Sequence, residues 1–308
     1  MPATSLIQSG KTPRDKAVTS SMKGRQLEGR TALITGASRG IGRAIATRLA
    51  AEGAAVALGA SRPGKHGDLS GTLEEAVAEI SRSGGKAAGV VADLSSDSER
   101  ADLIARAEEA IGPIDILVNN AAMGRWSLPS TTTLAHRRKM FEVNFNAPID
   151  LAQQALPGMR ARGRGWILNI GSDSSRQPPV PYRDTPEAAH VIVAYGATKA
   201  ALNRYTEGLA HEVANDGVFV NGLAPVAIVL TQEAARFVGH IAAANPDMVE
   251  PPEVMVEAAL ELVSAHHVGR LCYSRPLLHS VARPVRSLDG MKILGDAFLA
   301  ADLDSVVA

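Results

Sequence analysis

Six short apolar runs alternate with longer segments of helical pattern after residue 30, and this alternation constrains the fold more than any other feature. The runs are nearly continuous in apolar residues, which is expected for strands that are buried on both faces of a sheet. Strand–helix units joined by right-handed crossovers build a doubly wound parallel sheet, so we predict a three-layer α/β/α fold. The expected strands are 31–36, 54–60, 86–93, 114–121, 165–171 and 218–224, and the expected helices are 41–53, 73–83, 97–111, 134–159, 194–215 and 254–263.

The chain is predicted to form one domain preceded by an arm. No linker and no shift in composition divides residues 27–308. Residues 1–26 are rich in Ser, Thr, Lys and Arg and poor in large apolar side chains, a composition typical of flexible segments. We therefore expect a flexible N-terminal arm over 1–26 and a single domain over 27–308.

Composition excludes several classes of protein. Lys and Arg number 32 and Asp and Glu number 32, so the net charge is zero and no excess of cations indicates a nucleic-acid partner. A single cysteine, Cys272, leaves no intrachain disulfide and no cysteine-based zinc site, and His266-His267 is expected to be a surface pair instead of a metal site. No apolar stretch approaches the roughly 20 residues that span a bilayer. We predict no metal, no membrane span and a reducing, cytoplasmic location.

A glycine-rich turn, T-G-A-S-R-G-I-G (35–42), joins the first expected strand to the first expected helix. Gly36 allows the tight turn, Gly40 lets the main chain approach a pyrophosphate, and Gly42 lets the helix pack on the sheet. The helix N-terminus then presents free N–H groups to phosphate. We expect Ser38 and Ile41 of the same turn to contact a dinucleotide.

The segment after the second expected strand favours NADP(H) over NAD(H), although NAD(H) is not excluded. A site for NAD usually carries Asp or Glu there to bind the ribose 2′-hydroxyl. Here the first carboxylate is Asp68, whereas Ser61, Arg62 and the nearby Arg39 are suited to a 2′-phosphate.

Tyr195 and Lys199 lie four residues apart in Y-G-A-T-K, so a helix places them on one face. A phenol ordinarily titrates near pH 10. A neighbouring ammonium and a positively charged nicotinamide would favour the phenolate, which lowers the pKa and makes a tyrosine useful as a proton carrier.

These motifs together resemble the short-chain dehydrogenase/reductase family, whose members have a Rossmann fold. The resemblance covers about residues 28–272. The matching residues, in chain order, are TGASRGIG (35–42), Asp93, NNAA (119–122), Asn144, Ser172, YGATK (195–199) and NGLAP (221–225).

The resemblance implies a role for each catalytic position. Tyr195 would be the general acid or base, and Lys199 would lower its pKa and hold the nicotinamide ribose. Ser172 would hydrogen-bond the substrate oxygen, and Asn144 would hold a water in a proton relay to Lys199. The cofactor contacts that it implies further along the chain are Asp93 at the adenine, then Leu94, Asn120, Pro225 and Ile228. Asn119 and Asn120 would belong to the main chain that frames the cofactor.

The sequence also departs from the family. Ser172 and Tyr195 are 23 positions apart because a proline-rich segment, 176–190, is inserted, and we expect it to be a substrate or interface loop. Pro225-Val226 replaces the usual Pro-Gly. Five places after that proline, where the family has a hydroxyl, this chain has Leu230, and Thr231 follows.

The sequence predicts an NADP(H)-dependent oxidoreductase that interconverts a secondary alcohol and a ketone. Residues of about 226–250 are mostly apolar and are expected to form a lid, which favours a hydrophobic, steroid-like or bulky ketone. The loop at 61–72 is similar to that of hydroxysteroid-dehydrogenase-like members of the family. A 3-oxoacyl thioester reductase and a catalytically silent NADP-binding sensor or scaffold remain alternatives. Family resemblance implies a homodimer or homotetramer formed through helices 134–159 and 194–215.

Overall fold

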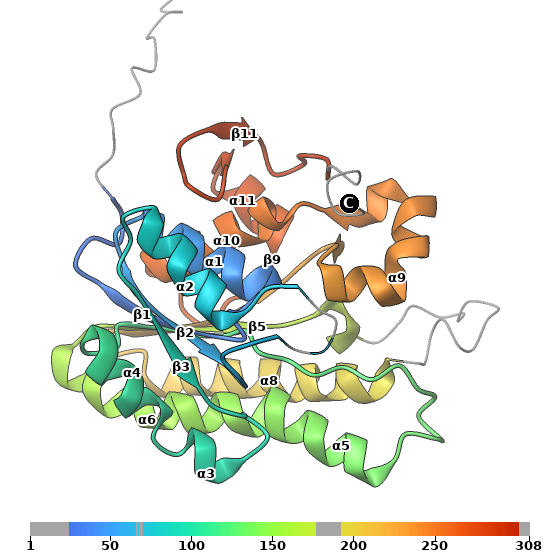
Figure 1. The fold of residues 1–308 in the computed structure, drawn as a ribbon, viewed down its shortest axis with the longest axis horizontal. Coiled ribbons are helices and arrows are strands. Elements are labelled where there is room, and N and C mark those ends of the chain that lie inside the picture. The colour runs from blue at the N-terminus through green and yellow to red at the C-terminus, as the bar shows by residue number, and fades with distance from the viewer. Residues whose placement is uncertain (1–24, 66, 68–69, 177–191, 302–308) are drawn as a thin grey trace, which may run out of the picture.

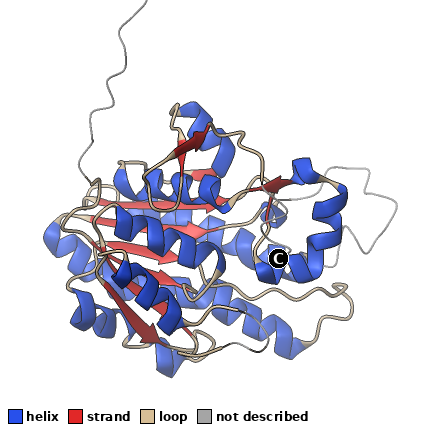
Figure 2. Cartoon of the chain, turned by 45° about the horizontal axis from the view of Figure 1, so that its top comes forward, coloured by secondary structure: helices blue, strands red, loops and turns tan. Residues whose placement is uncertain are grey.

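Seven parallel strands form the central sheet of the protein. The computed structural model describes residues 25–65, 67, 70–176 and 192–301. The strand order is β3-β2-β1-β4-β5-β6-β9, and helices cover both faces (Figures 1 and 2), so the predicted doubly wound α/β/α fold is confirmed. The strands are β1 (Thr31–Thr35), β2 (Ala55–Ala60), β3 (Ala87–Val91), β4 (Ile116–Asn119), β5 (Gly165–Ile170), β6 (Val218–Ala224) and β9 (Leu271–Tyr273).

The helices form two layers. In Figure 1, α1, α2 and α10 lie above the sheet, and α4, α6 and α8 lie below it. The layers consist of α1 (Gly40–Ala51), α2 (Leu73–Arg82) and α10 (Pro252–Ser264) on one side, and α3 (Asp97–Arg100), α4 (Leu103–Ile111), α5 (Leu134–Phe141), α6 (Ala147–Arg162) and α8 (Val193–Glu212) on the other.

Burial on both faces explains the continuous apolar runs. Within β1, Ile34 packs into the apolar cluster between the sheet and α1, whereas its neighbour Leu33 packs into the separate cluster between the sheet and the helices α4 and α6. Likewise, Leu168 of β5 packs into the first cluster and Ile167 packs into the second. Because successive side chains of a strand point to opposite faces, each position must be apolar.

Two expected helices are interrupted. The segment 97–111 forms α3 and α4, and the segment 134–159 contains a π-helical turn, Glu142–Asn146, between α5 and α6. A π-turn inserts one residue into a helix and is held by tertiary contacts, which a hydrophobic period does not reveal. β9 was also not predicted. It has three residues and pairs with β6 from Gly222↔Leu271 onward.

The segment after β9 adds a cap to the α10 side of the sheet. It contains α11 (Ser274–Ser280) and the antiparallel pair β10 (Val285–Arg286) and β11 (Ile293–Gly295). Arg283 joins this cap to α10 through ion pairs with Glu257 and Glu261, both 2.6 Å long.

The lid expected at 226–250 consists of β7 (Ile228–Val229), α9 (Gln232–Ala244), a 3-10 turn (Pro246–Met248) and β8 (Val249–Glu250). β7 and β8 pair in parallel, so the lid begins and ends at the same place. In Figure 1 it lies at the right, beyond the carboxyl ends of the strands.

The order of the strands reverses between β1 and β4, where ligands of open α/β sheets bind.

None of the helices in the described parts of the chain has the length and hydropathy needed to cross a bilayer.

Candidate active site

A cavity of about 1140 Å³ opens at the carboxyl ends of the strands. It extends from the glycine-rich turn, past Asn120, to Ser172 and Tyr195, and the lid borders it. Most predicted site residues line this cavity: Gly36, Ser38, Arg39, Gly40, Ile41, Ser61, Arg62, Asp93, Leu94, Asn120, Ser172, Tyr195, Pro225 and Ile228. Gly42, Asn144 and Lys199 are buried behind its wall.

The glycine-rich turn has no room for side chains at two of its positions. Gly36 has a φ of +66°, and a β-carbon there would lie 2.9 Å from Cα of Ala121. A β-carbon on Gly42 would lie 2.4 Å from Nδ2 of Asn120. This amide donates to the main-chain oxygens of Thr35, at 2.9 Å, and Gly36, at 3.3 Å. Asn120, which directly follows β4, therefore fixes the conformation of the turn. The N-terminus of α1 can present main-chain N–H groups to a pyrophosphate.

The end of the cavity near the carboxyl end of β2 is basic. Arg62 is exposed just after β2, and Arg43 and Lys139, which the sequence analysis missed, also line the cavity. Burial pushes the pKa of Asp93 upward, but hydrogen bonds from Ser95 and the charges of Lys139 and Arg62 outweigh it, so the pKa lies below its usual value. The cations Arg62 and Lys139 suit a 2′-phosphate, for which Arg62 was predicted, and the ionised Asp93 can accept a hydrogen bond from the adenine amine.

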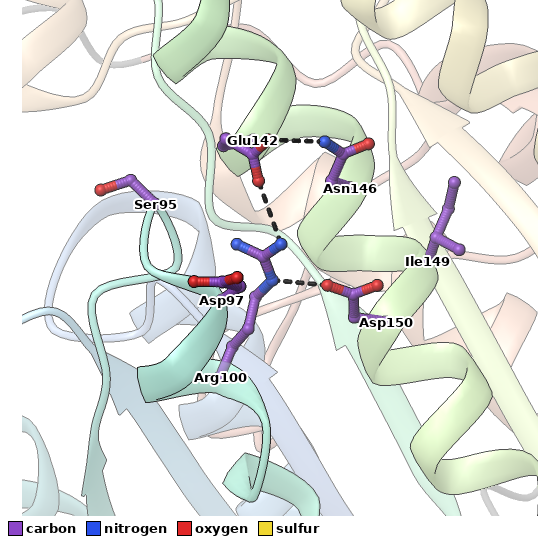
Figure 3. A pocket seen from close by; sticks show the side chains of 7 residues that line it. All are labelled: Ser95, Asp97, Arg100, Glu142, Asn146, Ile149 and Asp150. Carbon is purple, nitrogen blue, oxygen red and sulfur yellow. Dashed lines mark hydrogen bonds and ion pairs between the residues drawn. The ribbon is translucent and has the colours of Figure 1, made fainter.

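Arg100 connects this end of the cavity to the π-helical turn (Figure 3). Its guanidinium donates to Asp150 at 2.6 Å, to Glu142 at 3.0 Å and to the main-chain oxygen of Leu94 at 3.0 Å. Arg100, Glu142 and Asp150 border a separate hollow of about 440 Å³. Arg100 therefore fixes Leu94, a predicted cofactor contact, relative to the turn that carries Asn144.

Ser172, Tyr195 and Lys199 come together at the other end. Ser172 follows β5 and caps a 3-10 turn (Asp173–Ser175), where its Oγ accepts from the main-chain N–H of Ser174 at 3.2 Å. Ser172 also acts on the phenol of Tyr195, because its side chain lowers the pKa of that phenol. Lys199 lies behind that phenol, 5.8 Å from the ring centroid, and its Nζ donates to the main-chain oxygen of Ile170 at 2.7 Å.

Burial shifts the pKa values of Tyr195 and Lys199. It raises the pKa of Tyr195 to about 12, although the side chain of Ser172 opposes this rise. It lowers the pKa of Lys199 to about 8. The sequence predicts a lowered pKa for Tyr195 beside an ammonium and a bound nicotinamide, whereas in this structure the desolvation of the phenol raises the pKa. A phenol that stays protonated can donate a proton to a carbonyl oxygen.

Comparisons with known proteins agree with this geometry. The family model described as short chain dehydrogenase matches residues 30–238. The chain belongs to the short-chain dehydrogenase family.

Individual members of the short-chain dehydrogenase family are similar over most of the chain. Tropinone reductase-like 3 of Erythroxylum coca is 37% identical over 66% of this chain and 72% of its own length. Among solved structures, a 3-oxoacyl (acyl-carrier-protein) reductase of Agrobacterium tumefaciens with NADP bound is 35% identical, covers 83% of this chain and 98% of its own, and has a TM-score of 0.70. A metagenomic short-chain oxidoreductase in complex with NADP is 29% identical, covers 80% and 98%, and has a TM-score of 0.65.

Asn144 lies in the π-helical turn with both side-chain N–H groups engaged. They donate to the main-chain oxygen of Met123 at 2.8 Å and to Oγ1 of Thr198 at 3.0 Å, while Oδ1 accepts from the N–H of Met123 at 2.7 Å. Thr198 in turn donates to the main-chain oxygen of Tyr195 at 2.7 Å. The side chain of Asn144 therefore positions the Tyr195 turn of α8, and the water relay predicted for it stays a prediction.

Two positions differ from the sequence-based expectation. Asn119 does not frame the cavity, because its amide points into the core and donates to Oδ1 of Asn169 at 2.9 Å, whereas Asn120 lines the cavity. Leu230 is buried in the lid, and the following residue, Thr231, lines the cavity beside Gly40. The methyl group of Thr231 lies toward Gly40, and its Oγ1 accepts from the main-chain N–H of Ala234 at 3.2 Å.

Gly196 is a site residue that the sequence analysis missed. A β-carbon there would lie 2.2 Å from the main-chain oxygen of Ser174, so only glycine lets α8 approach the 3-10 turn after Ser172. The glycine within Y-G-A-T-K was the available signal.

The remaining expectations concern segments away from these contacts. The arm 1–26 lies outside the described residues except for its last two positions, and the insertion 176–190 does so except for Arg176. His266 stacks on Phe219 with ring centroids 4.5 Å apart, and Nε2 of His267 lies 2.9 Å from Oε1 of Glu261. Among the described residues, no group of three or more His, Cys, Asp or Glu side chains is arranged to hold a metal.

Proposed function

We propose that this chain is an NADP(H)-dependent oxidoreductase that interconverts a secondary alcohol and a ketone on a hydrophobic substrate. One observation carries the proposal: Ser172 and Tyr195 line the same cavity as the glycine-rich turn. A dinucleotide held at the turn would reach the pair through one continuous space.

Each catalytic side chain has a task in this reaction. Tyr195 donates its phenolic proton to the carbonyl oxygen of the ketone, and Ser172 donates a hydrogen bond to the same oxygen. The ammonium of Lys199, fixed by Ile170, favours the phenolate that forms as the proton leaves. A bound nicotinamide would supply the hydride to the carbonyl carbon. In the oxidative direction, the phenolate takes the proton from the alcohol.

The basic end of the cavity supports NADP(H) as the preferred cofactor. Arg39, Ser61 and Arg62 line it, and the described end of β2 carries no carboxylate that would repel a 2′-phosphate. The Agrobacterium and metagenomic relatives bind NADP, which supports the same choice.

Apolar side chains support a hydrophobic substrate. The cavity that Tyr195 lines is also bordered by Val226, Ala227 and Met248 of the lid and by Trp126 after β4. A ketone with a large apolar body, such as a steroid-like or bulky aromatic ketone, would bury its surface against them.

A 3-oxoacyl thioester reductase is the second candidate, because the similar Agrobacterium protein is named as a reductase of 3-oxoacyl groups. A silent NADP-binding sensor is the third, but such a protein has no need of the Ser172, Tyr195 and Lys199 set.

The proposal is tested with a panel of substrates and NADPH absorbance. We expect turnover of bulky cyclic or aromatic ketones, with kcat/KM above that of acetoacetyl-CoA. The reverse ranking would favour the thioester reductase, and NADPH binding without turnover of any ketone or thioester would favour the sensor.

The assembly and boundaries are part of the proposal. We expect a single domain over 27–308 and a homodimer or homotetramer in which α6 and α8 meet their copies. Light scattering coupled to size-exclusion chromatography measures the assembly, and a monomeric mass would contradict it. A cytoplasmic location stays a prediction.

A further inference from the structure

The two ends of the lid, residues 226–250, meet at one buried hydroxyl. The main-chain N–H of Val226, where the lid begins, donates to Oγ of Ser274 at 3.3 Å. The same Oγ donates to the carboxylate of Glu250, where the lid ends, with 2.8 Å to Oε1 and 2.9 Å to Oε2. Ser274 belongs to α11, outside the lid, so it joins both ends of the lid to the body of the protein.

The carboxylate in this contact is fully buried. Glu250 and Ser274 both have 0% exposure. Arg275 contributes a charge, because its Nε donates to Glu250 at 3.3 Å and its Nη2 to the main-chain oxygen of Val249 at 3.0 Å. Burial raises the pKa of Glu250, and the hydrogen bonds from Ser274 and Arg275 oppose the rise. A buried carboxylate is costly unless its partners stay in place, so the contact resists opening.

The contact joins residues next to the wall of the cavity. Val226 lines the cavity, and so do Asp247 and Met248, which come just before Glu250 in the chain. Glu250 and Ser274 do not line it themselves. A change in the contact would therefore reach the substrate through the lid and leave the glycine-rich turn untouched.

A second contact holds the lid from outside. Leu230, Ala242 and Val249 form a small apolar cluster within the lid, and Ala301 of the C-terminal segment packs against it. The segment after β9 therefore contacts the lid at its base, through Ser274 and Arg275, and again near residue 301.

We propose that Glu250 and Ser274 are positioning residues that hold the lid over the substrate. They contact neither substrate nor cofactor, and they set the affinity for the ketone by fixing Val226 and Met248. The effect on catalysis rests on the proposed function, whereas the effect on the lid does not.

Steady-state kinetics test the effect on catalysis. Ser274→Ala removes the shared hydroxyl, and Glu250→Gln keeps the shape but removes the charge. We expect KM for the best ketone to rise about tenfold in each variant, with kcat changed less than about threefold and the dissociation constant of NADPH unchanged.

Glu257→Gln is the matched control. Glu257 is another buried carboxylate, held by Arg48 and Arg283 at 2.6 Å each, but it lies in α10 and borders neither cavity nor lid. We expect this variant to lose stability while KM stays at the wild-type value. An equal rise in KM in the control, or no rise in Ser274→Ala and Glu250→Gln, would overturn the proposal.

Hydrogen exchange tests the lid without any turnover. In the absence of ligand, peptides covering 226–250 should exchange at least about fivefold faster in Ser274→Ala than in the wild type, and at the wild-type rate in Glu257→Gln. Wild-type protein that reduces no ketone would end the proposed function and leave this comparison valid. Unchanged exchange over 226–250 in Ser274→Ala would overturn the role of the contact itself.

Discussion

A β-carbon on Gly196 would lie 2.2 Å from the main-chain oxygen of Ser174. This closeness brings the first turn of α8, with Tyr195, against the 3-10 turn that begins at Ser172. The placement of the two proposed catalytic hydroxyls relative to each other therefore depends on a residue with no side chain.

Replacing this glycine should reduce turnover without harming cofactor binding. Gly196→Ala must push α8 away from Ser174, and a displacement of about 1 Å at reacting groups can cost on the order of 10²-fold in rate. We expect kcat to fall between about tenfold and 100-fold, with NADPH affinity within about threefold of wild type. Gly208→Ala is the control, because that position is exposed on the same helix and a β-carbon would have its nearest neighbour at 3.8 Å. Equal kcat values for both variants and wild type would contradict the account.

Replacing Arg62 by an acidic residue should shift the cofactor preference from NADPH toward NADH. We expect kcat/KM for NADPH at least about tenfold above that for NADH, since tenfold corresponds to roughly 1.4 kcal/mol. Arg62→Asp should move the preference toward NADH, because a carboxylate repels the 2′-phosphate and accepts from a 2′-hydroxyl. Lys86→Asp makes the same change of charge at the opposite end of the sheet and should leave the ratio unchanged. Equal efficiency of wild type with both cofactors would refute the assignment.

Stability should depend on pH through Lys199. Burial lowers its pKa from 10.5 to about 8, so between these values the unfolded chain binds more protons than the folded one. The penalty of burying the ammonium is fully present below pH 8 and is relieved as the pH rises toward 10.5. Relative to Lys199→Met, which does not titrate, the wild type should therefore gain roughly 2 kcal/mol in the free energy of unfolding between pH 7 and pH 10.

Urea denaturation at the two pH values measures this gain. Lys86→Met, at an exposed lysine, should show no comparable change relative to the wild type. A difference between wild type and Lys199→Met that stays constant with pH would show that Lys199 titrates at its ordinary pKa.

The sequence was sufficient for the parts of the fold that follow a local period. Strands such as β1 and β5, which are buried on both faces, consist mostly of apolar residues. The glycine-rich turn is recognised by three glycines, and a β-carbon on any of them would contact main-chain or side-chain atoms. β9 was not predicted because three residues carry too little pattern, and its pairing with β6 is decided by tertiary structure.

Side-chain direction accounts for the errors in the site. Asn119 is the last residue of β4 and its amide points into the core, whereas Asn120 follows the strand and lines the cavity. The sequence does not show which of these two adjacent residues faces the cavity. The break of the long helix at Asn144 depends on its bonds to Met123 and Thr198, which are distant in sequence. The buried contact between Glu250 and Ser274 joins two segments that no sequence motif connects.

The kcat of Tyr195→Phe, measured with saturating NADPH and the best ketone of the panel, tests the central claim most directly. The substitution removes the hydroxyl that faces Ser172 and keeps the buried ring. If Tyr195 donates the proton, kcat should fall at least about 10²-fold while the dissociation constant of NADPH, followed by fluorescence, stays within about threefold of wild type. Turnover near the wild-type value with NADPH bound normally would show that another group supplies the proton.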